Sequence, residues 1–166
     1  MIAIALLSLY LNSPVYEISR QVEGYVQGVP VTLEVVNLGS TDKSGSPLAL
    51  EKQAADAFME MRADMAKAGL SLRLNYAHRT MAQQTNLYKK NRKLASPPGL
   101  STHQEGRAID VSGCTKKVRK KRRSTPVCKW LKSHAAAYGF SRPTSKEPWH
   151  WEFSGRPSDS VASARF

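Results

Sequence analysis

The sequence lacks the features that mark several common protein classes. It contains two cysteines, with no CxxC pair and no Cys/His spacing typical of a zinc knuckle, so we expect no cysteine-built metal site. It has no glycine-rich nucleotide-binding fingerprint and no internal repeat. Its longest apolar run, IAIALLSLYL at residues 2–11, is too short to cross a bilayer. What remains is one folded domain, since 166 residues with 41% hydrophobic content can bury a core.

The N-terminal apolar run has two interpretations. It resembles the apolar core of a secretion signal, but no basic residues precede it and no clear small-x-small cleavage site follows it. We expect residues 1–20 to be either a signal remnant or an N-terminal helix. Residues 21–155 then form the folded domain, and the small, polar residues 156–166 form a flexible tail.

The chain is strongly basic, with a net charge of +12. Seven basic residues fall within the eight positions from Lys116 to Arg123. Such charge favours anionic partners, namely nucleic acid, anionic membranes or cell-wall polymers. The run contains no aromatic residue on which bases could stack, so no specific nucleic-acid partner is expected. Two hypotheses stay open for this run: a solvated loop and an anion-docking segment.

Cys114 and Cys128 lie on either side of this basic run. A disulfide between them would close a short, self-repelling loop and could contribute about 3 kcal/mol of stability. The alternative is two unrelated reduced thiols. We favour the disulfide because of its position, and it implies an oxidising compartment.

Hydrophobic patterning predicts an α+β domain. The interleaved elements follow no regular βαβ rhythm, so we expect a small, mostly antiparallel sheet packed with helices. The expected strands are 22–26, 31–38, 70–76, 108–111 and 149–153. The expected helices are 48–67, begun by Pro47 and ended by Gly69, then 81–94, capped by Thr80, and a third from Thr125-Pro126 to Gly139.

Two segments contain several side chains that could bind a metal or transfer protons: STHQEGRAID at 101–110 and EPWHW at 147–151. Their two imidazoles and one carboxylate, from His103, Asp110 and His150, make a three-ligand set suited to zinc. Such a set leaves one coordination position for water, which marks a catalytic rather than a structural site.

Catalysis at such a site also needs a carboxylate that is not a ligand. Glu147 precedes His150 by three residues, with Pro148 bending the path between them, so it could move a proton in the same cleft. Gly106 would allow a tight turn between the first two ligands. By spacing alone, these histidines could equally be ordinary core or surface residues, like His78 and His134 elsewhere in the chain.

The order of motifs resembles one family of zinc peptidases. SxHxxGxAxD followed by ExWH is similar to the VanY-like D-alanyl-D-alanine carboxypeptidases and L-alanyl-D-glutamate endopeptidases of the LAS group. The resemblance extends over about residues 25–153. It also includes LEKQAADAF at 50–58, Arg79-Thr80 with Gln84, Leu87 and Tyr88, the segment from Trp130-Leu131 to Phe140, and EPWHWEF at 147–153.

The resemblance implies a role for each matching residue and the hedgehog/D,D-peptidase-like fold. One Zn²⁺ would be held by His103, Asp110 and His150. Glu147 would act as general base and then general acid, Arg79 would stabilise the developing oxyanion, and Ser101 and Gln84 would line the substrate site.

The resemblance also implies a substrate and a location. Residues 21–155 would be a monomeric zinc peptidase domain that cuts peptidoglycan stem peptides, with release of C-terminal D-alanine as the leading hypothesis. It would act in the periplasm or outside the cell, near anionic wall polymers bound through Lys116–Arg123. The alternatives are a phage-type endopeptidase and a non-catalytic zinc-containing binding module. The sequence departs from the family at 76–79 and in the Cys-bracketed insertion.

Overall fold

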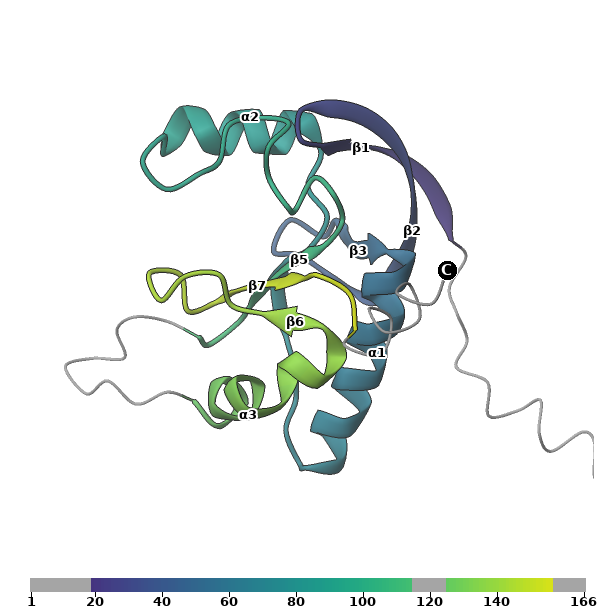
Figure 1. Ribbon diagram of the computed structural model, residues 1–166, viewed down its shortest axis with the longest axis vertical. Coiled ribbons are helices and arrows are strands. Elements are labelled where there is room, and N and C mark those ends of the chain that lie inside the picture. Colours follow the sequence, from purple (N-terminus) through teal and green to yellow (C-terminus); the bar gives the residue numbers. More distant parts are fainter. Residues whose placement is uncertain (1–18, 115–124, 157–166) are drawn as a thin grey trace, which may run out of the picture.

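The computed structural model describes residues 19–114 and 125–156, which form two antiparallel sheets and three α-helices (Figure 1). The predicted α+β class is confirmed. The strands are β1 (Arg20–Val26), β2 (Val29–Thr41), β3 (Pro47–Glu51), β4 (Leu74–Tyr76), β5 (Ala108–Val111), β6 (Phe140–Ser141) and β7 (His150–Phe153). The helices are α1 (Lys52–Lys67), α2 (Met81–Lys90) and α3 (Pro126–His134), with a 3₁₀ turn at Ala135–Tyr138. Our expectations for the N-terminal run, the basic run 116–123 and the tail fall outside the described residues, apart from residues 19, 20 and 156.

The first sheet has the order β1-β2-β3, and the predicted strands 22–26 and 31–38 lie within β1 and β2, which pair as an antiparallel hairpin. The hairpin arches towards α2 (Figure 1) and binds the loop that precedes β5. The Tyr25 amide donates to the Gln104 carbonyl over 3.0 Å, and the Gly28 amide donates to the Gly99 carbonyl over 2.9 Å. The hairpin therefore holds the loop that carries two predicted site residues, Ser101 and His103.

The predicted start of the first helix is wrong, because Pro47–Glu51 forms β3 and not a first helical turn. Leu48, Ala49 and Leu50 are all buried, which a continuous apolar run allows in a strand covered on both faces. The helix α1 begins at Lys52, directly after β3. The Glu51 carboxylate caps it by accepting hydrogen bonds from two amides of the first turn.

Three other elements are shorter than predicted. The expected strand 70–76 is reduced to β4, because its neighbour β5 has only four residues to pair with it. The helix after Thr80 ends at Lys90, where Asn91 leaves the helical conformation, although Thr80 caps it as predicted. The third helix changes to a 3₁₀ turn after His134 before ending at Gly139.

The second sheet has the order β4-β5-β7-β6, and α1 packs beneath both sheets. The buried face of α1 supplies much of the core through Ala54, Ala57, Phe58, Met61 and Met65. A disulfide joins Cys114 to Cys128, the pairing that the sequence favoured, and both cysteines are buried. It ties Cys114, three residues after β5, to Cys128 in the first turn of α3.

Gly106 occupies a position that only glycine fits well. Its φ is +70°, and an added Cβ would lie 2.8 Å from the Glu51 amide nitrogen. That amide donates to the Gly106 carbonyl over 2.9 Å, which ties the turn before β5 to the start of α1. The tight turn expected between His103 and Asp110 is therefore present.

We expect Gly106→Ala to destabilise the protein more than Gly69→Ala. Both positions have left-handed backbone, at φ +70° and +72°, so both substitutions cost roughly 1–2 kcal/mol of strain. Only Gly106 lacks room for a Cβ, which adds roughly 1–3 kcal/mol. Urea unfolding of the two variants measures the difference. Equal losses of unfolding free energy would show that the contact with Glu51 does not constrain the turn.

Candidate active site

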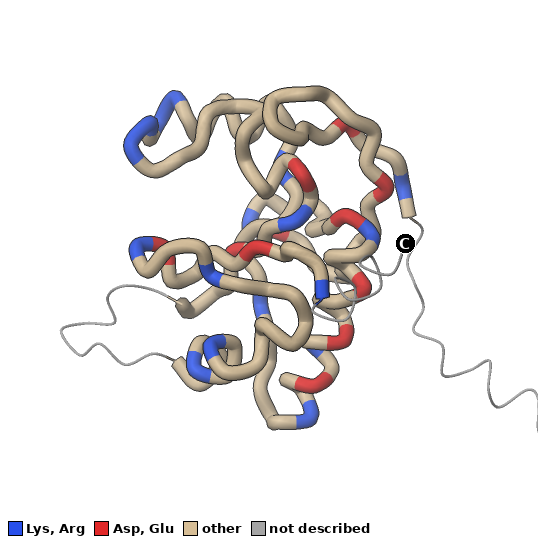
Figure 2. Tube along the Cα trace, in the orientation of Figure 1, with Lys and Arg blue, Asp and Glu red and all other residues tan. Residues whose placement is uncertain are grey.

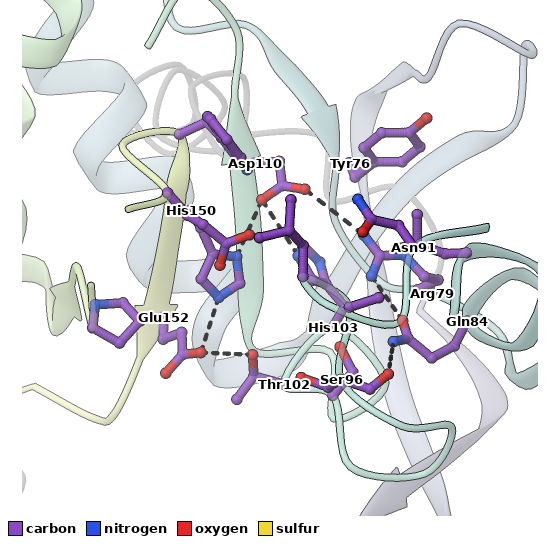
Figure 3. A pocket seen from close by; sticks show the side chains of 17 residues that line it. Tyr76, Arg79, Gln84, Asn91, Ser96, Thr102, His103, Asp110, His150 and Glu152 are labelled. Atoms are coloured by element: carbon purple, nitrogen blue, oxygen red, sulfur yellow. Dashed lines mark hydrogen bonds and ion pairs between the residues drawn. The ribbon is translucent and has the colours of Figure 1, made fainter. Parts of the chain in front are cut away.

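Three polar side chains converge on one point from separate segments. Asp110 on β5 and His150 on β7 are directly paired in the sheet register. His103 lies in the turn-rich segment before β5 and approaches from the adjacent side (Figure 3). The pairing of β5 with β7 thus brings Asp110 of the first predicted segment next to His150 of the second, although the two residues are 40 positions apart in the chain.

One oxygen of Asp110 faces both imidazoles. Its Oδ1 lies 3.1 Å from Nδ1 of His150 and 3.4 Å from Nε2 of His103. One ligand atom from each of the three residues lies within 4.8 Å of the others, and all three side chains are buried or nearly so. The arrangement can hold a metal ion.

The far nitrogen of each imidazole has a partner of its own. Nδ1 of His103 lies 2.7 Å from the Ala77 carbonyl, which can only accept, so this nitrogen carries the proton. Nε2 of His150 lies 2.9 Å from the Glu152 carboxylate. The inner nitrogen of each ring faces the common point, where loss of its proton would free a lone pair for a metal. Outer partners orient metal-binding histidines in this way.

The donor set fits zinc. Two imidazole nitrogens and one carboxylate oxygen match the ligands of open zinc sites. Ligands about 2.0–2.1 Å from a tetrahedral zinc lie about 3.3 Å apart, close to the two separations observed around Asp110. A metal at this point would replace the protons now shared among the three groups, so its affinity would depend on pH.

Burial and pairing shift the pKa values of these groups in opposite directions. Burial lowers the pKa of His103, although Asp110 partly opposes that shift. Burial also lowers the pKa of His150, but its hydrogen bonds to Asp110 and Glu152 outweigh burial and raise that pKa to about 9. For Asp110, the hydrogen bonds from both imidazoles outweigh the raising effect of burial and hold the pKa well below its usual range. Asp110 is therefore the fixed negative charge of the site.

Arg79 lies beside this carboxylate and is held by its own partners. Its guanidinium donates to Oε1 of Gln84 over 2.7 Å, lies 3.7 Å from the other oxygen of Asp110, and stacks over Tyr76. Gln84 is fully buried, and its amide nitrogen donates to the Ser96 carbonyl over 2.6 Å. Burial lowers the pKa of Arg79, and the carboxylates of Asp110 and Glu147 oppose that shift. Gln84 thus links the arginine to the loop after α2.

A cavity of about 300 Å³ opens over these groups. All seven residues that the sequence assigned to metal, catalysis or substrate line it: Arg79, Gln84, Ser101, His103, Asp110, Glu147 and His150. The Glu147 carbonyl accepts from the His150 amide over 3.0 Å, so the short turn expected around Pro148 brings both residues to the cavity. His78 and His134 do not line it.

Two residues that contact the site, Glu152 and Thr102, were not predicted from the sequence. Glu152 accepts from His150 and, over 2.9 Å, from the Thr102 hydroxyl (Figure 3). The hydrogen bond to His150 holds the pKa of Glu152 below its usual value. Strand period could have found Glu152, since residues two apart on a strand share a face. Thr102 gave no such signal.

Fold and site together define an α+β domain with a candidate metal site made of two histidines and one aspartate. The model of the family "VanY: D-alanyl-D-alanine carboxypeptidase" matches residues 47–156, and the chain belongs to this family. The match includes every residue of the cavity and leaves out the whole β1–β2 hairpin.

Similar proteins agree with this placement. A D-alanyl-D-alanine carboxypeptidase of Enterococcus faecium is 29% identical over 79% of this chain and 48% of its own length. The chain spans about half the length of the curated relatives it matches.

Solved structures share the fold. The LdcB LD-carboxypeptidase, whose structure concerns peptidoglycan recognition, is 27% identical, with a TM-score of 0.55 over 70% of this chain and 64% of that one. A mutant of the vancomycin-resistance D,D-pentapeptidase VanY in complex with Zn(II) is 17% identical, with a TM-score of 0.54 over 80% of this chain and 85% of that one.

We expect removal of the His78 imidazole to reduce the loss of stability in acid. Burial, then Arg20 and His103, lower the pKa of His78 from 6.5 to about 4, and its Nε2 is buried without a hydrogen-bond partner. The unfolded chain binds this proton more readily, so stability is fully present above pH 6.5 and is lost as pH falls towards 4.

For metal-free protein, this group should account for roughly 1–2 kcal/mol of the loss in unfolding free energy between pH 7 and pH 5. His78→Leu should lose less by that amount in denaturant titrations at the two pH values. An identical loss in the variant would show that His78 is as easily protonated in the folded protein as in the unfolded chain.

Proposed function

We propose that the protein is a zinc peptidase that hydrolyses peptidoglycan stem peptides and releases their C-terminal D-alanine. One observation carries the proposal: three ligand atoms of His103, Asp110 and His150 converge within 4.8 Å in a cavity that Glu147 and Arg79 also line. This set supports a catalytic site rather than a structural zinc site, because three protein ligands leave a position for water.

Bound zinc would supply Lewis acidity towards a carbonyl and would lower the pKa of a water molecule. Glu147, which is not among the three donors, is the group available to take a proton from that water and deliver it to the leaving amine. Its place on the cavity wall, one turn before His150, supports this role.

Arg79 is suited to hold the substrate carbonyl or carboxylate. A guanidinium has five N–H donors, and the contacts to Gln84 and Asp110 leave others for a ligand in the cavity. Because Gln84 and Tyr76 fix its orientation, the positive charge is in place before substrate binds, which is the condition for electrostatic stabilisation. Ser101 and Thr102 also line the cavity and add hydroxyl groups to its polar lining.

The activities of the relatives support peptidoglycan stem peptides as the substrate. The Enterococcus relative is a D-alanyl-D-alanine carboxypeptidase, and the LdcB structure concerns peptidoglycan recognition. The Cys114–Cys128 disulfide supports action outside the cytoplasm or in the periplasm, where disulfides persist. Among the described residues, no helix combines the length and the apolar character needed to cross a bilayer.

We expect Glu147→Ala to lower kcat on purified muropeptides by roughly 10²- to 10⁴-fold while zinc content is retained. Mass spectrometry of the products identifies the bond that is cut: free D-alanine indicates a carboxypeptidase, and separated stem fragments indicate an endopeptidase. Full activity in Glu147→Ala would refute the proton-transfer role. Equal zinc content in variant and parent guards against a trivial loss of metal.

We expect Glu152→Ala to weaken zinc binding by about 10- to 100-fold, because it removes the acceptor that orients His150. Glu152→Gln should bind zinc nearly as tightly as the parent, since its amide oxygen can still accept from the imidazole. Competition with a chromophoric chelator measures these affinities.

Glu105→Ala is a matched control for the Glu152 variants. Glu105 lies in the same sequence segment as His103, carries the same charge and does not line the cavity. If Glu105→Ala weakens zinc as much as Glu152→Ala does, net charge and not the hydrogen bond to His150 sets the affinity.

A further inference from the structure

The acidic and basic residues of this chain are segregated along the sequence. No aspartate or glutamate occurs between Asp64 and Glu105, or between Asp110 and Glu147. These two segments hold seven and eleven of the chain's 25 lysines and arginines. Such spacing leaves long stretches of positive charge without a local carboxylate to neutralise them.

Described residues of both segments contribute to the wall of the cavity. Asn91, Leu94 and Ala95 line it on the α2 side, and Pro143 lines it on the other. Basic residues alternate with these lining residues. Those on the α2 side are Lys89, Lys90, Arg92 and Lys93, and those on the other side are Arg142 and Lys146.

The charge on the α2 side faces solvent and has no internal counter-charge. We call the four residues Lys89, Lys90, Arg92 and Lys93 the basic rim. All four are exposed, and none forms an ion pair with a carboxylate of residues 19–114 or 125–156. Figure 2 shows these basic positions at the end of α2, whereas most acidic positions lie on the far side, along α1 and the hairpin. The basic rim is therefore a positively charged surface that lies apart from most of the protein's acidic residues.

We infer that the basic rim binds a linear wall polymer with repeated phosphodiester groups and so holds the cavity against the wall. Unpaired lysine and arginine side chains attract polyanions and raise their local concentration. Base stacking on the rim is disfavoured, because the rim has no aromatic residue and the adjoining Tyr88 ring has the Arg92 guanidinium over it, 5.6 Å from the ring centroid. The chemistry thus favours a polyol phosphate over a single-stranded nucleic acid.

This inference differs from the expectation for Lys116–Arg123, since it rests on described residues at the edge of the cavity. None of the four rim residues lines the cavity itself, so polymer binding can be separated from hydrolysis. The test compares a rim variant, Lys90→Gln with Arg92→Gln and Lys93→Gln, with a control that also loses three charges. The control is Arg73→Gln with Lys129→Gln and Lys132→Gln. These three residues are exposed, lie outside the cavity and form no ion pair with a carboxylate in the part of the chain that the structure describes.

Binding is measured by sedimentation with poly(glycerol phosphate) at about 0.15 M salt, the physiological range. The rim variant should bind roughly tenfold or more weakly than the parent, with a shallower salt dependence, and the control should bind as the parent does. Cleavage of a short soluble stem peptide should be equal in all three proteins, whereas cleavage of intact walls carrying the polymer should fall only in the rim variant.

Three results would overturn the inference: no binding of the polymer by the parent, an equal loss of binding in rim variant and control, or tighter binding of a single-stranded oligonucleotide of equal charge. Each can be seen while the soluble peptide is still cleaved. Absence of peptide cleavage by the parent would count against the proposed function and leaves the polymer measurement valid by itself.

Discussion

The contact on which the site depends is that of the Asp110 carboxylate with two imidazoles. Pairing of β5 with β7 sets Asp110 opposite His150, and the turn through Gly106 returns the chain so that His103 meets the same oxygen. Each element of this contact is fixed by backbone geometry. A slip of one residue in the β5–β7 register would turn one of the paired side chains to the other face of the sheet and separate the ligands.

Around this contact, the buried side chains of Arg79, Gln84 and His150 each have a polar partner that fixes their orientation. Burying charges costs several kcal/mol per ion unless they are paired and hydrogen-bonded. Arg79 and His150 both lie beside the Asp110 carboxylate, which offsets part of that cost. Gln84 accepts a hydrogen bond from Arg79, and Glu152 accepts one from His150. The result is a set of charges that needs little rearrangement when substrate enters, since each orientation is already determined.

Much of this arrangement follows from the sequence. Apolar patterning located β1, β2 and β5, and Thr80 and Gly139 marked the start of α2 and the end of the 3₁₀ turn. All seven residues expected from the motifs line one cavity. Local signals failed where tertiary pairing decides the outcome. Pro47–Glu51 has the composition of a first helical turn, but pairing with β2 makes it a strand. The contact of Thr102 with Glu152 joins residues 50 positions apart, and no local pattern encodes it.

The central claim, that His103, Asp110 and His150 hold zinc, is tested most directly by zinc-edge X-ray absorption on the loaded protein and on His150→Ala. The account predicts nitrogen and oxygen ligands at about 2.0–2.1 Å, with two imidazoles in the parent and one in the variant. Sulfur scattering near about 2.3 Å, or the same number of imidazoles in both proteins, would contradict it.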